Sequence, residues 1–407
     1  MTLPSNVAGE RPAKALRPMA STYAYFAAIM ALGLMSASLG PTLPGLAEQT
    51  GSAISQISFL FLARSTGYML GSLLGGKALD MLPGHSVLAV AVAVISVAMF
   101  AVPLLPVLWI LAAVLAIAGL AEGSVDVGSN ALLVWVHRSA VGPYMQGLHF
   151  FFGVGAFLSP IIVVQVMELT GGIKGPYWVL ALIILPVALW LARLASPRPI
   201  HESQGEDASL VNWTLVGMIA LFMFIYVGAE VSFGGWIYTY ATTLGIASAQ
   251  AAGYLTSVYW GGLTAGRVLA IPIANRYRPR TILLGDLVGC LLSVGIILVW
   301  RESSLALWVG AIGLGLSMAS IFPTVILWAE RRMTLTGSVT RWFFVGASLG
   351  AMAFPWLVGQ FFDRRGPSMT MVIVFGLLVV NVVIFYLLMH LGGEARPVPE
   401  KERVTQT

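Results

Sequence analysis

One motif occurs twice in this chain: Gly155-Ala156-Phe157-Leu158-Ser159-Pro160 and, 195 positions later, Gly350-Ala351-Met352-Ala353-Phe354-Pro355. Seven pairs of glycines coincide at the same shift, where glycine frequency alone gives about two or three. They are Gly33 with Gly228, Gly40 with Gly235, Gly67 with Gly262, Gly71 with Gly266, Gly142 with Gly337, Gly155 with Gly350 and Gly171 with Gly366. Such self-similarity at a fixed period indicates two copies of one unit.

The composition around this repeat excludes a soluble protein. Of the 407 residues, 58% are hydrophobic and only 10% are charged, against about 25% charged in a soluble domain. Turn residues and charges cut the chain into twelve apolar segments, each long enough to span a bilayer. We therefore expect an all-α membrane protein of twelve transmembrane helices in two pseudo-symmetric six-helix bundles. The expected parts are a leader (1–22), two bundles (23–196 and 212–391), a linker (197–211) and a tail (392–407).

The distribution of basic residues predicts the orientation. Sixteen of the 22 lysines and arginines lie on one side of the predicted spans and four on the other; the remaining two lie inside spans. Because cytoplasmic loops carry the excess of Lys and Arg, we expect both termini in the cytoplasm and the chain in the cell inner (plasma) membrane. The net charge of +5 is thus a loop bias and not a nucleic-acid footprint.

A few ionisable residues remain inside the predicted spans. They are Arg64, Glu122, Asp126, Glu230, Arg267 and Asp286. A charge at the bilayer centre costs at least about 2.5–3.5 kcal/mol, so each needs a partner or water. Asp286 lies near a span end, which leaves the other five as functional candidates.

The span 107–136 carries the densest polar pattern. Glu122, Asp126 and Asn130 are spaced by four residues and therefore share one helix face. Two carboxylates one turn apart repel each other, which favours binding of a proton or a cation such as sodium between them. We expect Glu122 and Asp126 to couple an ion to transport; the alternative is a structural pair balanced by Arg64 and Arg267.

Other spans offer hydrogen-bonding groups beside flat aromatic rings. Amide, hydroxyl and carboxylate groups bind sugar hydroxyls, and a ring stacks on the C–H face of a sugar. The expected substrate-binding residues are Asn130, Gln146, His149, Glu230, Tyr259, Trp260 and Thr324. The competing interpretation is helix packing, or for His149 a hydrogen-bonded core residue.

Several of these stretches resemble major facilitator sugar transporters, specifically the sodium-dependent glucose transporters related to bacterial fucose permease. The similar stretches are 39–46 (Leu-Gly-Pro-Thr-Leu-Pro-Gly-Leu), 63–76, 119–130, 145–153, 226–236 and 259–267. The resemblance implies that Glu122 matches the carboxylate proposed to couple ion and sugar movement in fucose permease. It also implies that Asn130, Gln146 and Glu230 face the substrate.

The chain also departs from that family pattern. The first span has no acidic residue where fucose permease carries an aspartate. The loop after the second span keeps Gly76, Asp80 and Gly84 but lacks the basic residues that normally follow. We expect gating or structural roles for Arg64, Asp80 and Arg267, with an acidic partner or backbone carbonyls around Arg64.

The resulting prediction is a secondary active transporter for a sugar or similar polyol, coupled to a proton or sodium gradient. The chain has no Gly-x-x-x-x-Gly-Lys-Ser/Thr motif for a nucleotide. The alternative is a proton-coupled exporter of drugs or lipids. We expect no enzyme activity, no cofactor beyond the ion and no nucleic-acid partner, and a monomer in the lipid bilayer.

Overall fold

A computed structural model describes residues 18–197 and 212–391 of the chain. The expected linker and tail therefore lie almost wholly outside the described residues, as does most of the expected leader. The first helix begins at Pro18, inside the segment that we expected to be the leader.

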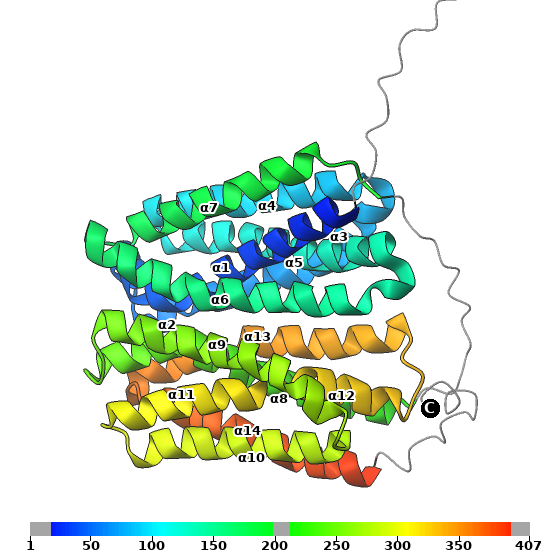
Figure 1. Ribbon diagram of the computed structural model, residues 1–407. Coiled ribbons are helices and arrows are strands. Elements are labelled where there is room, and N and C mark those ends of the chain that lie inside the picture. Colours follow the sequence, from blue (N-terminus) through cyan, green and yellow to red (C-terminus); the bar gives the residue numbers. More distant parts are fainter. Residues whose placement is uncertain (1–17, 198–211, 392–407) are drawn as a thin grey trace, which may run out of the picture.

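The first half of the chain forms one helical bundle, in the upper part of Figure 1. Its helices are α1 (Pro18–Thr50), α2 (Ile54–Ile57), α3 (Phe59–Met81), α4 (Gly84–Ala101), α5 (Leu108–His137), α6 (Gly142–Thr170) and α7 (Lys174–Arg193). Two 3-10 turns, η1 (Val102–Leu104) and η2 (Arg138–Ala140), follow α4 and α5. Because α2 and α3 are consecutive, the bundle has six membrane-length segments.

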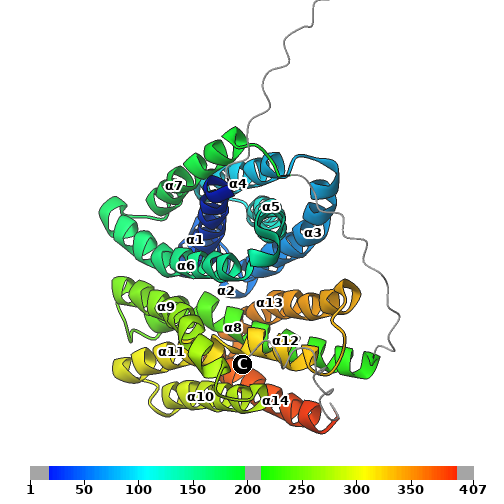
Figure 2. The same cartoon turned by 45° about the vertical axis from the view of Figure 1, so that its right-hand side comes forward.

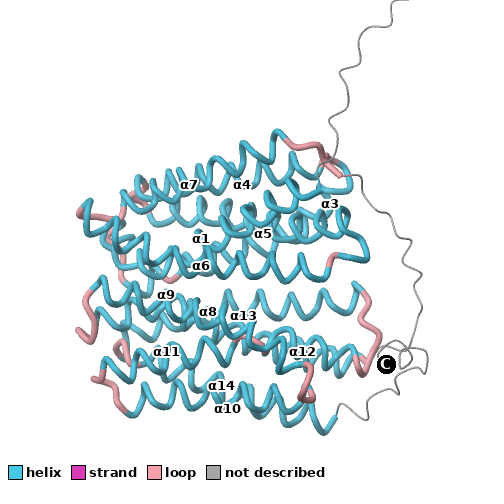
Figure 3. The backbone as a smooth tube through the Cα atoms, in the orientation of Figure 1, coloured by secondary structure: helices cyan, strands magenta, loops and turns pink. Residues whose placement is uncertain are grey.

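The second half forms a matching bundle below it, and the turned view in Figure 2 keeps the two groups apart. Its helices are α8 (Trp213–Thr243), α9 (Ala249–Ala274), α10 (Pro279–Val299), α11 (Ser304–Met318), α12 (Ile321–Glu330), α13 (Gly337–Arg365) and α14 (Met369–Leu391). Short loops join long, roughly parallel helices throughout the described chain (Figure 3). The start of α1 and the end of α14 lie at one end of the molecule, here called the terminal end; the opposite end is the far end.

Several of the repeated glycines are contact points between helices, whereas a Cβ atom on Gly142, Gly171 or Gly366 would meet no described neighbour within 4 Å. A Cβ atom on Gly33 of α1 would strike the α6 backbone, and one on Gly155 of α6 would strike the α1 backbone. The repeat places Gly228 of α8 against the ring of Phe354 on α13, and Gly350 of α13 against the α8 backbone. Small residues let helices approach closely in lipid, so the same packing device builds both halves.

Eleven segments of the described chain are long and apolar enough to cross a membrane. The twelfth, α9, has 26 residues and the length to span, but is not among them. It carries hydroxyls, several glycines and Arg267, which lower its hydropathy. A helix buried between others does not need an apolar face all round, and α9 packs against both α6 and α11.

Candidate functional site

The site begins with the close approach of α3 and α5. Cβ atoms on Gly67 or Gly71 of α3 would strike backbone atoms of α5, and Cβ atoms on Gly119 or Gly123 of α5 would strike α3. The two helices therefore meet backbone to backbone over two turns. Such contact fixes the register in which their polar side chains face each other.

That register creates two polar pairs, one turn apart. Arg64 forms a bidentate ion pair with Glu122, with Nε to Oε2 and Nη2 to Oε1 both at 2.8 Å. Tyr68 donates its hydroxyl proton to the carboxylate of Asp126. Both pairs join residues 58 positions apart in the sequence, as expected for parallel helices in constant register.

The Arg64–Glu122 pair is enclosed by the N-terminal bundle. The side chain of Glu122 is 0% exposed and that of Arg64 is 16% exposed. The guanidinium also donates from Nη2 to the hydroxyl of Ser36 on α1, at 2.7 Å. It is the one ion pair among residues 18–197 and 212–391, and it supplies the acidic partner expected for Arg64.

Asp126 has a different environment from Glu122. Its partners are neutral donors, the hydroxyl of Tyr68 and the side-chain amide of Asn130 at 3.1 Å. His149 of α6 lies within electrostatic reach of Asp126. The two carboxylates thus have separate partners instead of facing one another, and Asp126 lacks a bidentate cation. Hard cations bind oxygen ligands. Here such ligands could come from the carboxylate of Asp126, the hydroxyl of Tyr68 and the amide oxygen of Asn130.

The C-terminal bundle contributes a second acidic centre. Glu230 of α8 accepts a hydrogen bond from the hydroxyl of Tyr226, one turn earlier on the same helix. The hydroxyl of Tyr259 on α9 donates to the backbone oxygen of Glu230, at 3.0 Å. Arg267 lies about two turns after Tyr259 on α9. It interacts electrostatically with both Glu230 and His149. The guanidinium of Arg267 is thus within electrostatic reach of the acidic centre and of α6.

One donor of the predicted substrate set has no protein partner. The indole Nε1 of Trp260 is buried without a hydrogen bond among the described residues, and the side chain is 9% exposed. A buried N–H normally finds a partner. A bound hydroxyl group would supply one, and the substrate role of Trp260 stays a prediction.

The remaining predicted residues occupy mixed positions. Gln146 and His149 on α6 are exposed, whereas Thr324 on α12 is buried. Asp80 is exposed at the terminal end of α3. Asp286 of α10 accepts a hydrogen bond from the hydroxyl of Ser320, at 2.5 Å, so it has a protein partner inside its bundle.

Contacts between the bundles continue to the far end. Gln165 of α6 donates to the hydroxyl of Tyr254 on α9. The backbone N–H of Ser55 donates to Asp363 of α13 at 2.8 Å, and Gln360 donates to the backbone oxygen of Ser55 at 2.8 Å. At mid-helix, the Cα of Gly153 on α6 packs directly under Thr264 of α9. Beyond that point toward the terminal end, many side chains on both helices are exposed, and His149 is one of them.

This arrangement of two bundles around facing polar helices agrees with the sequence comparison. The family model of the Major Facilitator Superfamily matches residues 25–355. The chain belongs to the Major Facilitator Superfamily. As a family member it is a multi-pass membrane protein and a transporter, and the expected fold of two six-helix bundles is confirmed.

Curated relatives define the branch of the superfamily. The chain is 36% identical to sodium-dependent glucose transporter 1 of Xenopus laevis, over 79% of this chain and 72% of that protein. It is 31% identical to sodium-dependent glucose transporter 1A of Mus musculus, over 82% and 88% of the two chains. The resemblance to the sodium-dependent glucose transporter branch is thereby confirmed.

Solved structures of superfamily members share the fold at low sequence identity. The nucleoside transporter NupG matches with a TM-score of 0.75 and 12% identity, covering 90% of this chain and 99% of that one. A D-xylose-proton symporter matches with a TM-score of 0.70 and 14% identity, covering 90% and 97%.

Two residues of the site escaped the sequence analysis. Tyr68 and Ser36 were not predicted, because both are uncharged at neutral pH and the prediction rested on charged residues inside the spans. A signal for Tyr68 was present, because it follows Arg64 by four residues just as Asp126 follows Glu122. Ser36 had no such signal, since its contact with Arg64 depends on how α1 packs.

Proposed function

We propose that this superfamily member is a secondary active transporter that moves a sugar or similar polyol by alternating access, coupled to a proton or sodium gradient. The observation that carries the proposal is Asp126, a carboxylate well inside the membrane-length helix α5 and without a bidentate cationic partner. An acidic residue so placed is rare unless function retains it. The names of the relatives, sodium-dependent glucose transporters, support the substrate class and a coupled mode.

The two carboxylates of the predicted coupling site then have different tasks. Asp126 binds the proton or sodium ion, because its hydrogen-bond donors are neutral and no bidentate cation neutralises its charge. Glu122 contributes through its ion pair with Arg64, which holds α1, α3 and α5 together one turn away. Binding of the ion at Asp126 neutralises its negative charge. The conformational equilibrium of the two bundles then shifts, and with it the affinity for the substrate.

The substrate is proposed to lie between the bundles, within reach of the indole N–H of Trp260. Asn130, Gln146, His149 and Glu230 supply the acceptors and donors for its hydroxyl groups. The bundles meet toward the far end, as the Ser55–Asp363 hydrogen bond illustrates. In this proposal the site opens toward the terminal end, which is cytoplasmic, and the bundles rock to expose it to the other side.

Uptake by proteoliposomes tests the proposal. Purified protein is reconstituted, and the accumulation of a panel of labelled sugars is measured with imposed sodium or proton gradients. We expect gradient-driven accumulation of at least one hexose or polyol. Its absence across the panel, together with gradient-driven efflux of lipophilic compounds, would establish the exporter alternative.

An Asp126→Asn variant tests the coupling site in the same vesicles. The amide keeps the size of the side chain but carries no charge, so we expect sugar exchange without uphill accumulation. Glu168→Gln is the matched control, since Glu168 is an exposed carboxylate at the far end that accepts a hydrogen bond from Gln250. Wild-type accumulation by Asp126→Asn would contradict the assignment.

A further inference from the structure

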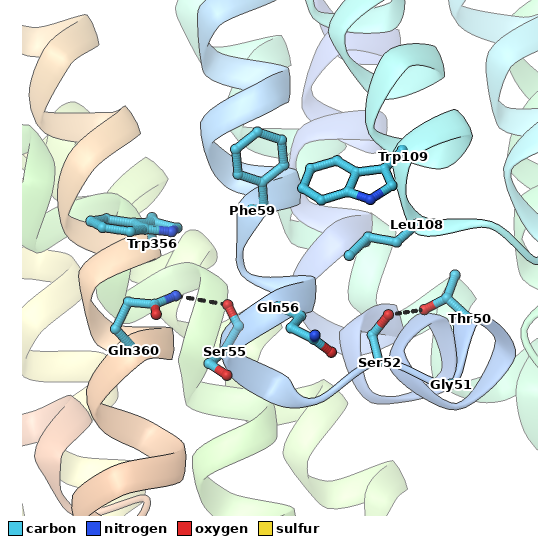
Figure 4. Close-up of a pocket in the computed structure, with 10 residues that line it drawn as sticks. All are labelled: Thr50, Gly51, Ser52, Ser55, Gln56, Phe59, Leu108, Trp109, Trp356 and Gln360. Carbon is cyan, nitrogen blue, oxygen red and sulfur yellow. Dashed lines mark hydrogen bonds between the residues drawn. The ribbon is translucent and has the colours of Figure 1, made fainter.

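The structure contains a hollow lined by polar and aromatic groups, at the far end and outside the proposed transport site. It has a volume of about 460 Å³, within the range of roughly 300–1,000 Å³ that small-molecule sites occupy. Both bundles line it: α1, α2, α3 and α5 on one side and α13 on the other. Figure 4 shows this hollow, here called the far-end groove.

Three aromatic rings form one side of the far-end groove. Phe59 and Trp109 meet edge to face, with ring centroids 5.2 Å apart and planes at 73°. Trp356 of α13 lies to the left of these two rings in Figure 4, at a similar height. The side chains of Trp109 and Trp356 are 65% and 36% exposed, so their faces are available to a ligand.

Amides and hydroxyls form the other side. Gln56 and Gln360 line the groove together with Ser52 and Thr50, and the hydroxyl of Thr50 donates to that of Ser52 at 2.9 Å. In Figure 4 these groups lie below the rings, around α2. All the lining residues belong to the described chain, and none of them is Asp, Glu, Lys, Arg or His. A charged ligand would therefore find no counter-charge on the groove wall.

We propose that the far-end groove is a binding site for a neutral glycosyl group. Aromatic faces stack on the C–H face of a hydroxylated ring, while amides and hydroxyls exchange hydrogen bonds with its hydroxyl groups. A belt of interfacial aromatics needs only rings facing the lipid. It does not account for two hydroxyls and two glutamines across a hollow from those rings. One amide atom of each glutamine bonds the backbone around α2, which leaves Gln56 Nε2 and Gln360 Oε1 for a ligand. The glycosyl group comes either from a free sugar in solution or from the headgroup of a lipid.

The groove also depends on how the bundles are arranged. Trp356 and Gln360 belong to α13, and the other lining residues belong to the N-terminal bundle. The groove is whole only while the far ends are together, held in part by the Gln360–Ser55 hydrogen bond. Occupancy therefore favours the far-end-closed arrangement and slows the step in which the far ends separate.

Photolabelling of the full-length protein in lipid nanodiscs tests the proposal. The probe is a diazirine-bearing octyl β-D-glucoside, and labelled positions are mapped by mass spectrometry. We expect labelling in 50–59 and beside Trp109 and Trp356. Trp109→Ala and Trp356→Ala should each raise the half-saturating probe concentration about tenfold, since each removes one stacking face. Trp178→Ala is the matched control, because Trp178 lies at the same end but stacks on Phe100, outside the groove.

Competition identifies the source of the glycosyl group. Displacement of the probe by methyl β-D-glucoside supports a site for free sugars, and displacement by unlabelled octyl β-D-glucoside alone supports a lipid headgroup. Equal displacement by octanol would overturn the proposal, because the groove would then take any amphiphile. Unchanged labelling in both tryptophan variants would also overturn it. Neither result bears on sugar uptake, so the groove can fail while the proposed transport function stands.

Discussion

Breaking the Arg64–Glu122 pair should cost more stability than replacing it altogether. Glu122 is 0% exposed and shares two hydrogen bonds of 2.8 Å with the guanidinium. Removing one partner of a buried ion pair strands the other charge and costs about 3–5 kcal/mol. We therefore expect Arg64→Met and Glu122→Leu each to lower the free energy of unfolding by that amount.

The double variant separates the pair from its parts. Replacing both partners by apolar residues of similar volume is often neutral or stabilising, so Arg64→Met with Glu122→Leu should lie within about 1 kcal/mol of the wild type. The coupling energy of the double-mutant cycle should then reach at least about 5 kcal/mol. Arg64→Met also removes the hydrogen bond to Ser36, both in the wild type and in the Glu122→Leu variant. Because this loss is the same in both, it cancels in the coupling energy.

Equilibrium unfolding of the purified protein in mixed micelles measures these values. The control is Glu168→Gln, which removes an exposed carboxylate and should change the free energy of unfolding by less than about 0.5 kcal/mol. Additive single effects of below about 1 kcal/mol each would refute the reasoning, since a buried bidentate pair cannot be so weak. Uptake by the same variants separates stability from coupling. If Glu122→Gln accumulates sugar at the wild-type level, Glu122 has only a structural part.

Further predictions concern the same helices. Tyr68→Phe removes a donor to Asp126 and should shift the ion or pH dependence of uptake by more than it changes sugar affinity; a change in affinity alone would contradict the proposed contact. Gly71→Ala places a methyl group against the α5 backbone and should lower unfolding free energy by about 1–3 kcal/mol, whereas Gly285→Ala, which faces open space, should have almost no effect. Asp80→Asn should lower turnover with little change in KM, as measured by initial uptake rates; a large rise in KM at normal turnover would refute a gating role.

The repeat in the sequence predicted the fold because backbone contact demands glycine wherever it recurs. Gly33 and Gly228 are at equivalent positions of the repeat. Gly33 is where α1 contacts α6, and Gly228 is where α8 contacts α13. The apolar pattern likewise predicted the number of membrane-length segments, although α1 begins earlier than expected, at Pro18. Local propensity and burial suffice for these features, since each depends on a single helix or on one repeated contact.

The pairing inside the site could not be predicted in the same way. Glu122 and Asp126 share a face of one helix, and the sequence alone therefore indicates that they are partners of each other. Their actual partners, Arg64 and Tyr68, come from α3. Which turn of α3 meets which turn of α5 depends on the register in which the glycines of the two helices pack against each other. That register is a property of the packed pair and cannot be derived from either helix alone.

The site lies where the two halves differ. At the repeat shift, the counterpart of Arg64 is Tyr259. Arg64 reaches Ser36 on α1, and Tyr259 reaches the backbone of Glu230 on α8, the helix equivalent to α1. One contact is made by a permanent charge and the other by a neutral hydroxyl, although the helices stand in the same relation. A neutral contact does not respond to a nearby proton or sodium ion as strongly as a charged one. We therefore expect ion dependence to follow substitutions in the N-terminal bundle, and substitution of Tyr259 to alter substrate affinity without altering the choice of ion.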